Sequence, residues 1–166
     1  MAGTWFRHVP AGLDAHHRPP HPADNRWQRG EVVDALYFAD SEETVWAEWY
    51  RFLAEVGLPP KQGLPRDLWR WKIELPEVAD LGDEASLARV GLPPLRPTRG
   101  QWPAFQAVGE QLFADGWPAL VSASAARPEG RTLCVFRTSR RVAGTWPVRP
   151  PITVADPPLV PTGMRT

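Results

Sequence analysis

Apolar and charged residues alternate most clearly over residues 68–75 of the chain. One set of positions holds the apolar residues Trp69, Trp71, Ile73 and Leu75, and the other holds Arg70, Lys72 and Glu74. A period of two places each set on one face of a strand, so the pattern predicts a β-strand with one buried face. Shorter apolar runs predict further strands over residues 4–9, 35–39, 119–124 and 132–136. The composition of residues 127–130, Arg-Pro-Glu-Gly, predicts a turn between the last two.

A helix is predicted over residues 42–56, between a capping residue and a glycine. Ser41 is a favourable N-cap, the two glutamates after it suit the positive end of the helix dipole, and Gly57 suits the end of the helix. At helical spacing the apolar residues form one broad stripe, which consists of Val45, Trp46, Trp49, Phe52, Leu53 and Val56. At about 100° per residue, Glu48 falls about 40° from Phe52. Its carboxylate is therefore expected where the buried stripe meets a groove or solvent.

A second helix is predicted from Trp102 or Pro103 to Ala114, because proline suits the first helical turn and Gly116 follows the end. The segment over residues 10–24 is rich in proline and histidine and is expected to be a loop. From residue 146 onward, repeated prolines favour either an extended edge segment or a disordered tail. The irregular mixture of strands and helices predicts an α+β fold, a compact mixed-sheet domain with few helices over residues 1–145, followed by a proline-rich C-terminal segment over 146–166.

Composition excludes several classes of protein. The chain has 166 residues, a formal net charge of zero and no basic block longer than Arg140-Arg141, which argues against direct nucleic-acid binding. A single cysteine, Cys134, rules out an intrachain disulfide and fits a reducing compartment. The sequence has neither an apolar run of about 20 residues nor a signal-peptide pattern, so we expect no membrane association and a cytoplasmic location. The chain also has 9 tryptophans, some of which are expected to line a concave site.

Three residues on consecutive short elements offer candidate chemistry. Arg26 precedes the strand predicted over residues 35–39, Tyr37 lies in that strand, and Glu48 lies on the helix that follows it. A cation, a phenol and a carboxylate in this order can hold an anionic ligand that carries an aromatic ring. Each residue also has an interpretation without a function. Arg26 could be a surface cation, Tyr37 a phenol in the core, and Glu48 a solvated carboxylate paired with Arg51 or Arg26.

Other parts of the sequence give weaker evidence of function. The histidines at 16, 17 and 21 lie in an extended loop without a completing Cys or Asp/Glu pattern, so we expect solvated histidines and no metal site. The sequence contains no glycine-rich phosphate loop and no Gly-x-Ser-x-Gly elbow. Cys134 lies in an apolar run and is expected to be an inert core thiol.

With these elements placed, the chain resembles the RES domain family. The resemblance rests on Arg26-Trp27, Gly30, the strand Tyr37-Phe-Ala39 and the helix segment Ala47-Glu48. It continues with a Trp-x-x-x-Gln-x-x-Gly pattern over residues 102–109 and a Ser-Ala-x-x-Pro-x-Gly pattern over residues 124–130. These motifs occur in the family's order and extend the resemblance from about residue 5 to about residue 136.

The resemblance implies an ADP-ribosyltransferase-like fold and a function. Known RES members are toxins of bacterial toxin–antitoxin pairs, consume NAD+, and are paired with an antitoxin that carries an Xre-like helix-turn-helix. For this chain the resemblance implies cleavage of the nicotinamide–ribose bond, with water or phosphate as acceptor. NAD+ is then the substrate, and no cofactor is expected.

The expected site residues follow from the same motifs, except Arg7, which lies outside them. Glu48 would stabilise the developing oxocarbenium charge on the ribose, and Arg26 could clamp a phosphate with its planar fork. Tyr37 would stack on the nicotinamide or cap the ribose, while Ser124 would hydrogen-bond the ribose or the carboxamide. Trp27 and Arg7 complete the NAD+-binding set, Arg7 as a second phosphate contact. Ser122 lies on the same strand face, so either serine can be the family's.

Two alternatives stay open at this point. The enzyme could transfer ADP-ribose onto a protein target instead of releasing it. A different class of function is a non-enzymatic interaction domain, in which the RES-like groove has decayed. Asn25 motivates this second alternative, because it stands where the family is expected to have a glycine, and the loop from Arg26 to Tyr37 is one residue longer.

Overall fold

The computed structural model describes residues 1–165, which form one mixed β-sheet with helices against it. Within these residues the sheet has seven strands in the order β4-β5-β6-β2-β1-β3-β7, and every neighbouring pair except β4–β5 is antiparallel. The predicted α+β class with a mixed sheet and few helices is confirmed. The strands are β1 (Ala2–Pro10), β2 (Asp34–Ala39), β3 (Arg66–Glu74), β4 (Ala79–Leu81), β5 (Ala119–Ala123), β6 (Arg131–Arg137) and β7 (Thr145–Val154).

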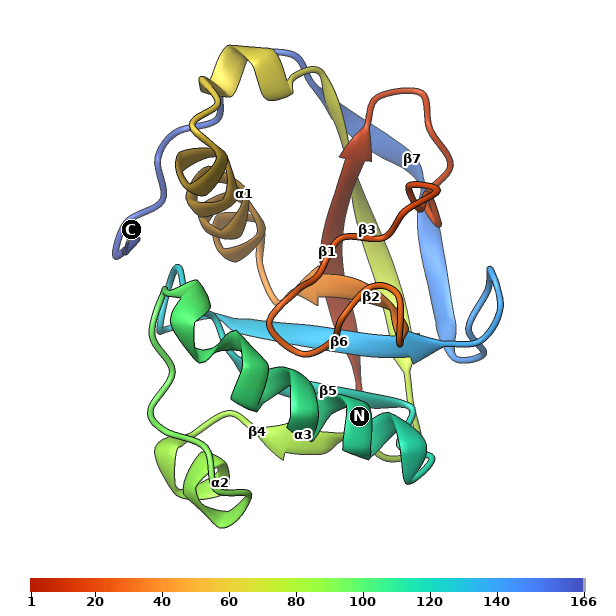
Figure 1. Ribbon diagram of the computed structural model, residues 1–166. Coiled ribbons are helices and arrows are strands. Elements are labelled where there is room, and N and C mark those ends of the chain that lie inside the picture. The colour runs from red at the N-terminus through yellow and green to blue at the C-terminus, as the bar shows by residue number, and fades with distance from the viewer. Residues whose placement is uncertain (166) are drawn as a thin grey trace.

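The sheet is divided into two groups of strands at the boundary between β1 and β2. In the part of the chain that the structure describes, one residue pair, Phe6 with Ala39, joins these two strands. By contrast, β1 pairs with β3 over nine positions from Ala2 to Pro10. Figure 1 shows β1, β3 and β7 running across the direction of β2, β6 and β5. The β1–β2 boundary is therefore an opening in the hydrogen-bonded ladder.

The main core lies between the inner faces of the two strand groups. The alternation predicted over residues 68–75 is confirmed: its apolar residues are buried and its charged residues are exposed. Trp71, which is fully buried, lies edge-on to Phe38 of β2, with 5.0 Å between the ring centroids. Contacts of this kind hold the two groups together where the ladder does not. The buried members of this core include Trp5, Val9, Leu36, Trp69, Ile73, Val121, Leu133 and Val135.

Helix α1 (Glu42–Val56) packs against β1, β2 and β3 and has the predicted ends. The Ser41 side chain accepts a hydrogen bond from the Thr44 backbone N–H, and Gly57 ends the helix in the left-handed conformation with φ 68°. Four residues of the predicted stripe are buried, namely Val45, Trp46, Trp49 and Leu53. The expectation for the other two was wrong: Phe52 is 47% exposed and Val56 is 42% exposed. The stripe is wider than the sheet surface that the helix covers, so its outer edge faces solvent.

Helix α3 (Trp102–Ala114) covers β5 and β6, and its predicted bounds are confirmed. The predicted β5–β6 hairpin is also confirmed. Two elements were not predicted, β4 and the helix α2 (Glu84–Arg89). β4 spans three residues, too few to display a period, and α2 has a capping box in which Asp83 and Ser86 exchange hydrogen bonds. Two short 3-10 turns, Pro60–Gly63 and Arg99–Gln101, complete the elements of the described chain.

The proline-rich C-terminal region begins with an edge strand. β7 pairs with β3 at the end of the sheet, and its prolines at 147, 150 and 151 fit an edge position, where a missing N–H is tolerated. Of the two sequence alternatives, the extended segment is therefore observed over residues 145–154. The division of the chain at residue 145 stays a prediction. No helix within residues 1–165 is long and apolar enough to cross a membrane.

The loop that carries Arg26 and Trp27 is fixed by helix α3. The Gln106 side-chain amide donates a hydrogen bond to the Asn25 carbonyl oxygen at 2.9 Å. One turn later, Gly109 lies so close to this loop that a Cβ atom would overlap the Trp27 carbonyl oxygen. Two residues of the Trp-x-x-x-Gln-x-x-Gly pattern thus hold the loop in place.

We expect the substitution Gly109→Ala to lower stability. In a helix interior, replacing glycine by alanine normally stabilises by about 1 kcal/mol, but here the added methyl group forces the Trp27 loop away. The net loss is expected to be about 1–3 kcal/mol, measured by urea unfolding. The control is Gly100→Ala, where the nearest atom to an added Cβ is 3.7 Å away. A Gly109→Ala protein as stable as the parent would contradict this packing.

Candidate active site

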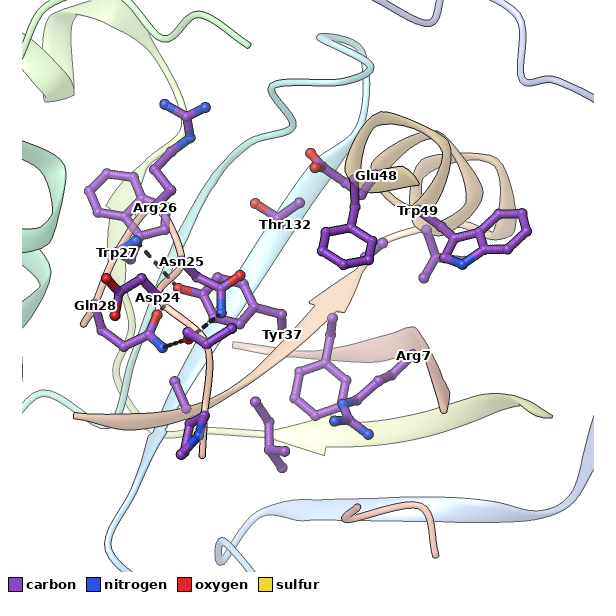
Figure 2. A pocket seen from close by; sticks show the side chains of 18 of the residues that line it. Arg7, Asp24, Asn25, Arg26, Trp27, Gln28, Tyr37, Glu48, Trp49 and Thr132 are labelled. Atoms are coloured by element: carbon purple, nitrogen blue, oxygen red, sulfur yellow. Dashed lines mark hydrogen bonds between the residues drawn. The ribbon is translucent and has the colours of Figure 1, made fainter. Parts of the chain in front are cut away.

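A cavity of about 610 Å³ opens beside the β1–β2 boundary. Its walls come from β1, β2, the loop before β2, helix α1 and the segment that leads into α3. Figure 2 shows Arg26 and Trp27 on one side of this cavity, Glu48 and Trp49 of α1 on the opposite side, and Tyr37 between them. Because β1 and β2 separate here, side chains from both strand groups reach one space.

Glu48 is held in a fixed orientation on the cavity wall. Its Oε1 accepts hydrogen bonds from the Ser124 hydroxyl at 2.7 Å and from the Ala126 backbone N–H at 3.3 Å. Its Oε2 accepts from Arg51 Nε at 3.1 Å. The carboxylate is thus neither freely solvated nor deeply buried, as its position at the border of the helix stripe predicted. The pairing of Glu48 with Arg51, which the alternative interpretation predicted, is also observed.

The two serines near the end of β5 have different partners. Ser124 is 2% exposed, donates to Glu48, and accepts a hydrogen bond from the Arg127 backbone N–H at 3.0 Å. Ser122 lines the cavity, and its hydroxyl accepts from the Trp27 indole N–H at 3.3 Å. The structure therefore brings Ser124 to the carboxylate and Ser122 to the tryptophan. Ser124 is not among the residues that line the cavity, but it contacts Glu48, which is.

Arg26 is a buried cation with one unsatisfied nitrogen. Its side chain is 8% exposed, and Nη2 donates to the Arg96 carbonyl oxygen at 2.8 Å. The guanidinium lies over the Phe105 ring, 5.3 Å from the centroid. Burial, with a contribution from the nearby Arg51 charge, lowers the pKa of Arg26 to about 10, so the group remains a cation at neutral pH. Nη1 has no hydrogen-bond partner within residues 1–165.

Tyr37 forms the floor between the two walls, and Trp27 lies beside it. Trp27 is 1% exposed and packs edge-on against Phe105, so it supports the cavity from the core. Its backbone N–H donates to the Tyr37 hydroxyl at 3.3 Å, and this hydroxyl donates to Gln28 Oε1 at 2.6 Å. Burial raises the pKa of Tyr37 well above its usual value of about 10. Tyr37 is therefore a neutral phenol at physiological pH.

Arg7 of β1 provides a second cation, below Tyr37 in the view of Figure 2. Nη1 donates to the Ala15 carbonyl oxygen at 2.8 Å and Nη2 donates to the His17 carbonyl oxygen at 3.0 Å. Burial, followed by the charges of Arg137 and Arg66, lowers the pKa of Arg7 to about 10. Arg7 thus lines the cavity and also fixes the loop after β1.

Several cavity residues were missed by sequence reasoning. His8 stacks on Trp46 with 5.2 Å between the ring centroids, and its Nδ1 accepts from Arg66 Nε at 2.7 Å. Arg99 and Trp102 line the cavity at the start of α3. Trp102 had been identified only as part of a motif, and nothing in the local sequence marks His8 or Arg99 as site residues. Their positions depend on contacts between distant segments.

The histidines after β1 differ from the expected solvated loop. His16 is buried and lies edge-on to Trp71, with 4.9 Å between the ring centroids, so the expectation was wrong for this residue. His21 is exposed, as expected. Within the described residues, no three His, Cys, Asp or Glu side chains are grouped so as to hold a metal ion. Cys134 is buried as predicted, and burial raises the pKa of its thiol to about 12.

Comparisons with known proteins agree with the sequence resemblance. The model of the RES domain family matches residues 4–159 of this chain. Among curated proteins, none matches the sequence. A chain in the crystal structure of the M. tuberculosis MbcT–MbcA toxin–antitoxin complex has a TM-score of 0.77 and 21% sequence identity, over 93% of this chain and 85% of that chain. At this identity the structural likeness shows a shared fold.

The burial of His8 predicts a pH-dependent stability. Burial and the neighbouring cations Arg66 and Arg7 hold the pKa of His8 well below its usual value of about 6.5. The unfolded chain therefore binds a proton near pH 6.5 that the folded chain does not, and the free energy of unfolding must fall as the pH decreases below about 6.5, by up to ~1.4 kcal/mol per pH unit.

The test of this prediction is urea unfolding between pH 7.5 and pH 5.5. His8→Gln is expected to reduce the slope of the free energy of unfolding against pH, because glutamine does not titrate. The matched control His21→Gln, at an exposed position, is expected to retain the parent slope. An unchanged slope in His8→Gln would show that His8 is not the group that titrates.

Proposed function

The chain belongs to the RES domain family, and we propose that it is the toxin of a toxin–antitoxin pair, an enzyme that cleaves the nicotinamide–ribose bond of NAD+. The observation that carries the proposal is the Glu48 carboxylate, which Ser124 and Arg51 fix beside a cavity that Arg7 and Arg26 also line. A structure of similar fold belongs to a toxin–antitoxin complex, which supports the toxin assignment. The proposed acceptor is water or inorganic phosphate.

The chemistry needs a fixed negative charge more than an acid. The bond from the ribose C1′ to the nicotinamide nitrogen breaks, and its electron pair leaves with the nicotinamide as a neutral ring. Positive charge develops on the ribose as an oxocarbenium-like state, which an adjacent carboxylate stabilises. Water then bonds to C1′ through its oxygen and loses one proton to solvent or a base. Inorganic phosphate instead bonds to C1′ through an anionic oxygen, which has no proton to lose. Glu48 fits the stabilising role, because its three hydrogen bonds fix its orientation before the substrate binds.

The remaining residues have proposed roles in binding and positioning. Ser124 is a positioning residue, since it contacts Glu48 and is otherwise buried. Tyr37, a neutral phenol on the cavity floor, would stack on the nicotinamide or cap the ribose. Arg26 and Arg7 would each contact phosphate, and Trp27 would keep the Arg26 loop in place. An Xre-like helix-turn-helix antitoxin is the proposed protein partner.

The direct test is NAD+ consumption by the purified chain and by Glu48→Gln. The substitution preserves the size of the side chain and the Arg51 contact surface but removes the charge, so we expect the fold to remain and the rate to fall by at least ~100-fold. The matched control is Glu43→Gln, an exposed glutamate on the same helix, which is expected to keep the parent rate. Equal turnover by Glu48→Gln and the parent would refute the role of Glu48.

The products of the same reaction separate the alternatives. Mass spectrometry is expected to find free ADP-ribose, or its phosphorylated form when inorganic phosphate is present. Labelled NAD+ that appears on a protein band would instead indicate transfer to a protein target. A folded, antitoxin-free sample that consumes no NAD+ would support the non-enzymatic interaction domain.

The role of Ser124 predicts a smaller effect. Ser124→Ala removes one hydrogen bond to the Glu48 carboxylate, and bonds to charged groups contribute about 1.5–3 kcal/mol. We expect kcat for NAD+ to fall roughly 10- to 100-fold, with KM almost unchanged, because the substrate does not contact the serine. Ser139→Ala, an exposed serine, serves as the control. A rise in KM with constant kcat would instead indicate that Ser124 binds substrate.

A further inference from the structure

Two buried N–H donors in the cavity wall lack an acceptor. They are Arg26 Nη1 and Trp102 Nε1, and no atom within residues 1–165 accepts a hydrogen bond from either. Leaving a buried donor unsatisfied costs free energy, and the cost is larger when the group is charged. A bound ligand that supplies acceptor oxygens would remove this cost at both positions.

One segment of chain contacts Arg26 and contains Trp102. The Arg26 guanidinium lies over Phe105, which follows Trp102 by three residues on α3 and shares its helix face. Arg26 also donates to the Arg96 carbonyl oxygen, and the Arg96 backbone N–H donates to the Gln101 side chain at 3.0 Å. The segment over residues 96–105 therefore orients both donors.

The charges around these donors favour an anion. The Arg99 guanidinium lies over the Trp102 ring, 4.9 Å from its centroid, and pairs with Glu55 at 3.0 Å. Arg51 pairs with both Glu48 and Glu55. The cations are thus Arg26, Arg51 and Arg99. The two carboxylates are both already paired, Glu48 with Arg51 and Glu55 with Arg51 and Arg99. The ion pairs of the described residues leave Arg26 without a carboxylate partner.

We infer that the part of the cavity lined by Arg26 and Trp102 binds the diphosphate of the dinucleotide, and that Trp102 is the second hydrogen-bond donor to it beside Arg26. Arg26 would present Nη1 to one phosphate oxygen, and Trp102 would present its indole N–H to another. Trp102 then makes the enzyme selective for substrates that carry a diphosphate over nucleosides that lack one. The identification of the diphosphate as that of NAD+ rests on the proposed function.

The test uses Trp102→Phe, which removes the N–H and keeps an aromatic ring under Arg99. Calorimetry is expected to show a roughly tenfold weaker affinity for ADP-ribose, the cost of one hydrogen bond to a charged group, and an unchanged affinity for adenosine. In turnover, kcat/KM for NAD+ is expected to fall by a similar factor, while kcat/KM for nicotinamide riboside stays constant. The matched control is Trp69→Phe, whose indole N–H is also unpartnered but lies outside the cavity lining.

The outcomes separate this inference from the proposed function. If ADP-ribose binds the parent and Trp102→Phe equally well, or binds neither, the diphosphate site is refuted. A similar loss for nicotinamide riboside would also refute it, because Trp102 would then act on the shape of the whole cavity. If the chain does not consume NAD+, the proposed function fails, yet a Trp102-dependent affinity for ADP-ribose would still establish the diphosphate site.

Discussion

The opening between β1 and β2 is the constraint on which the site depends. A continuous ladder between these strands would close the space that Arg7, Tyr37 and Glu48 share. Instead, one residue pair joins them in the described chain, and the buried core between the two strand groups supplies the cohesion that hydrogen bonds do not. Apolar burial at roughly 25 cal/mol per Å² tolerates such a gap, because it depends on area and has little directional preference.

The cavity combines fixed groups of opposite charge. Glu48 is oriented by three partners, two from the turn after β5 and one from α1. Arg26 and Arg7 are buried cations that remain charged at neutral pH despite lowered pKa values. Holding such groups away from water costs free energy, which the folded chain offsets elsewhere in its core. Preorganised charge of this kind stabilises a charged transition state without reorganisation during the reaction.

Local sequence patterns predicted the elements that have a clear period or a cap. Residues within a few positions of one another decide each of these features. The features are the alternation around Trp71, the Ser41 and Gly57 ends of α1, and the proline and glycine at the two ends of α3. The exposed positions of Phe52 and Val56 were not predictable in this way, because burial depends on how much of the helix the sheet covers. β4 and α2 were too short to show a period.

The candidate site was predictable only in part, for a related reason. The family motifs placed Arg26, Tyr37, Glu48 and Ser124 in order along the chain, and the structure brings them to one cavity or to its carboxylate. The contact between Ser124 and Glu48 spans 76 positions, and that between Arg26 and Arg96 spans 70. No local pattern encodes such contacts, so Trp102 and Arg99 entered the site only through the folded structure.

We propose that this cavity breaks the nicotinamide–ribose bond of NAD+. The most direct measurement is a time course of NAD+ incubated with the antitoxin-free parent chain, with and without inorganic phosphate, and analysed by mass spectrometry. We expect the release of free nicotinamide in amounts equal to the NAD+ consumed, together with ADP-ribose or its phosphorylated form. Intact NAD+ after prolonged incubation with a folded sample at high enzyme concentration would contradict it.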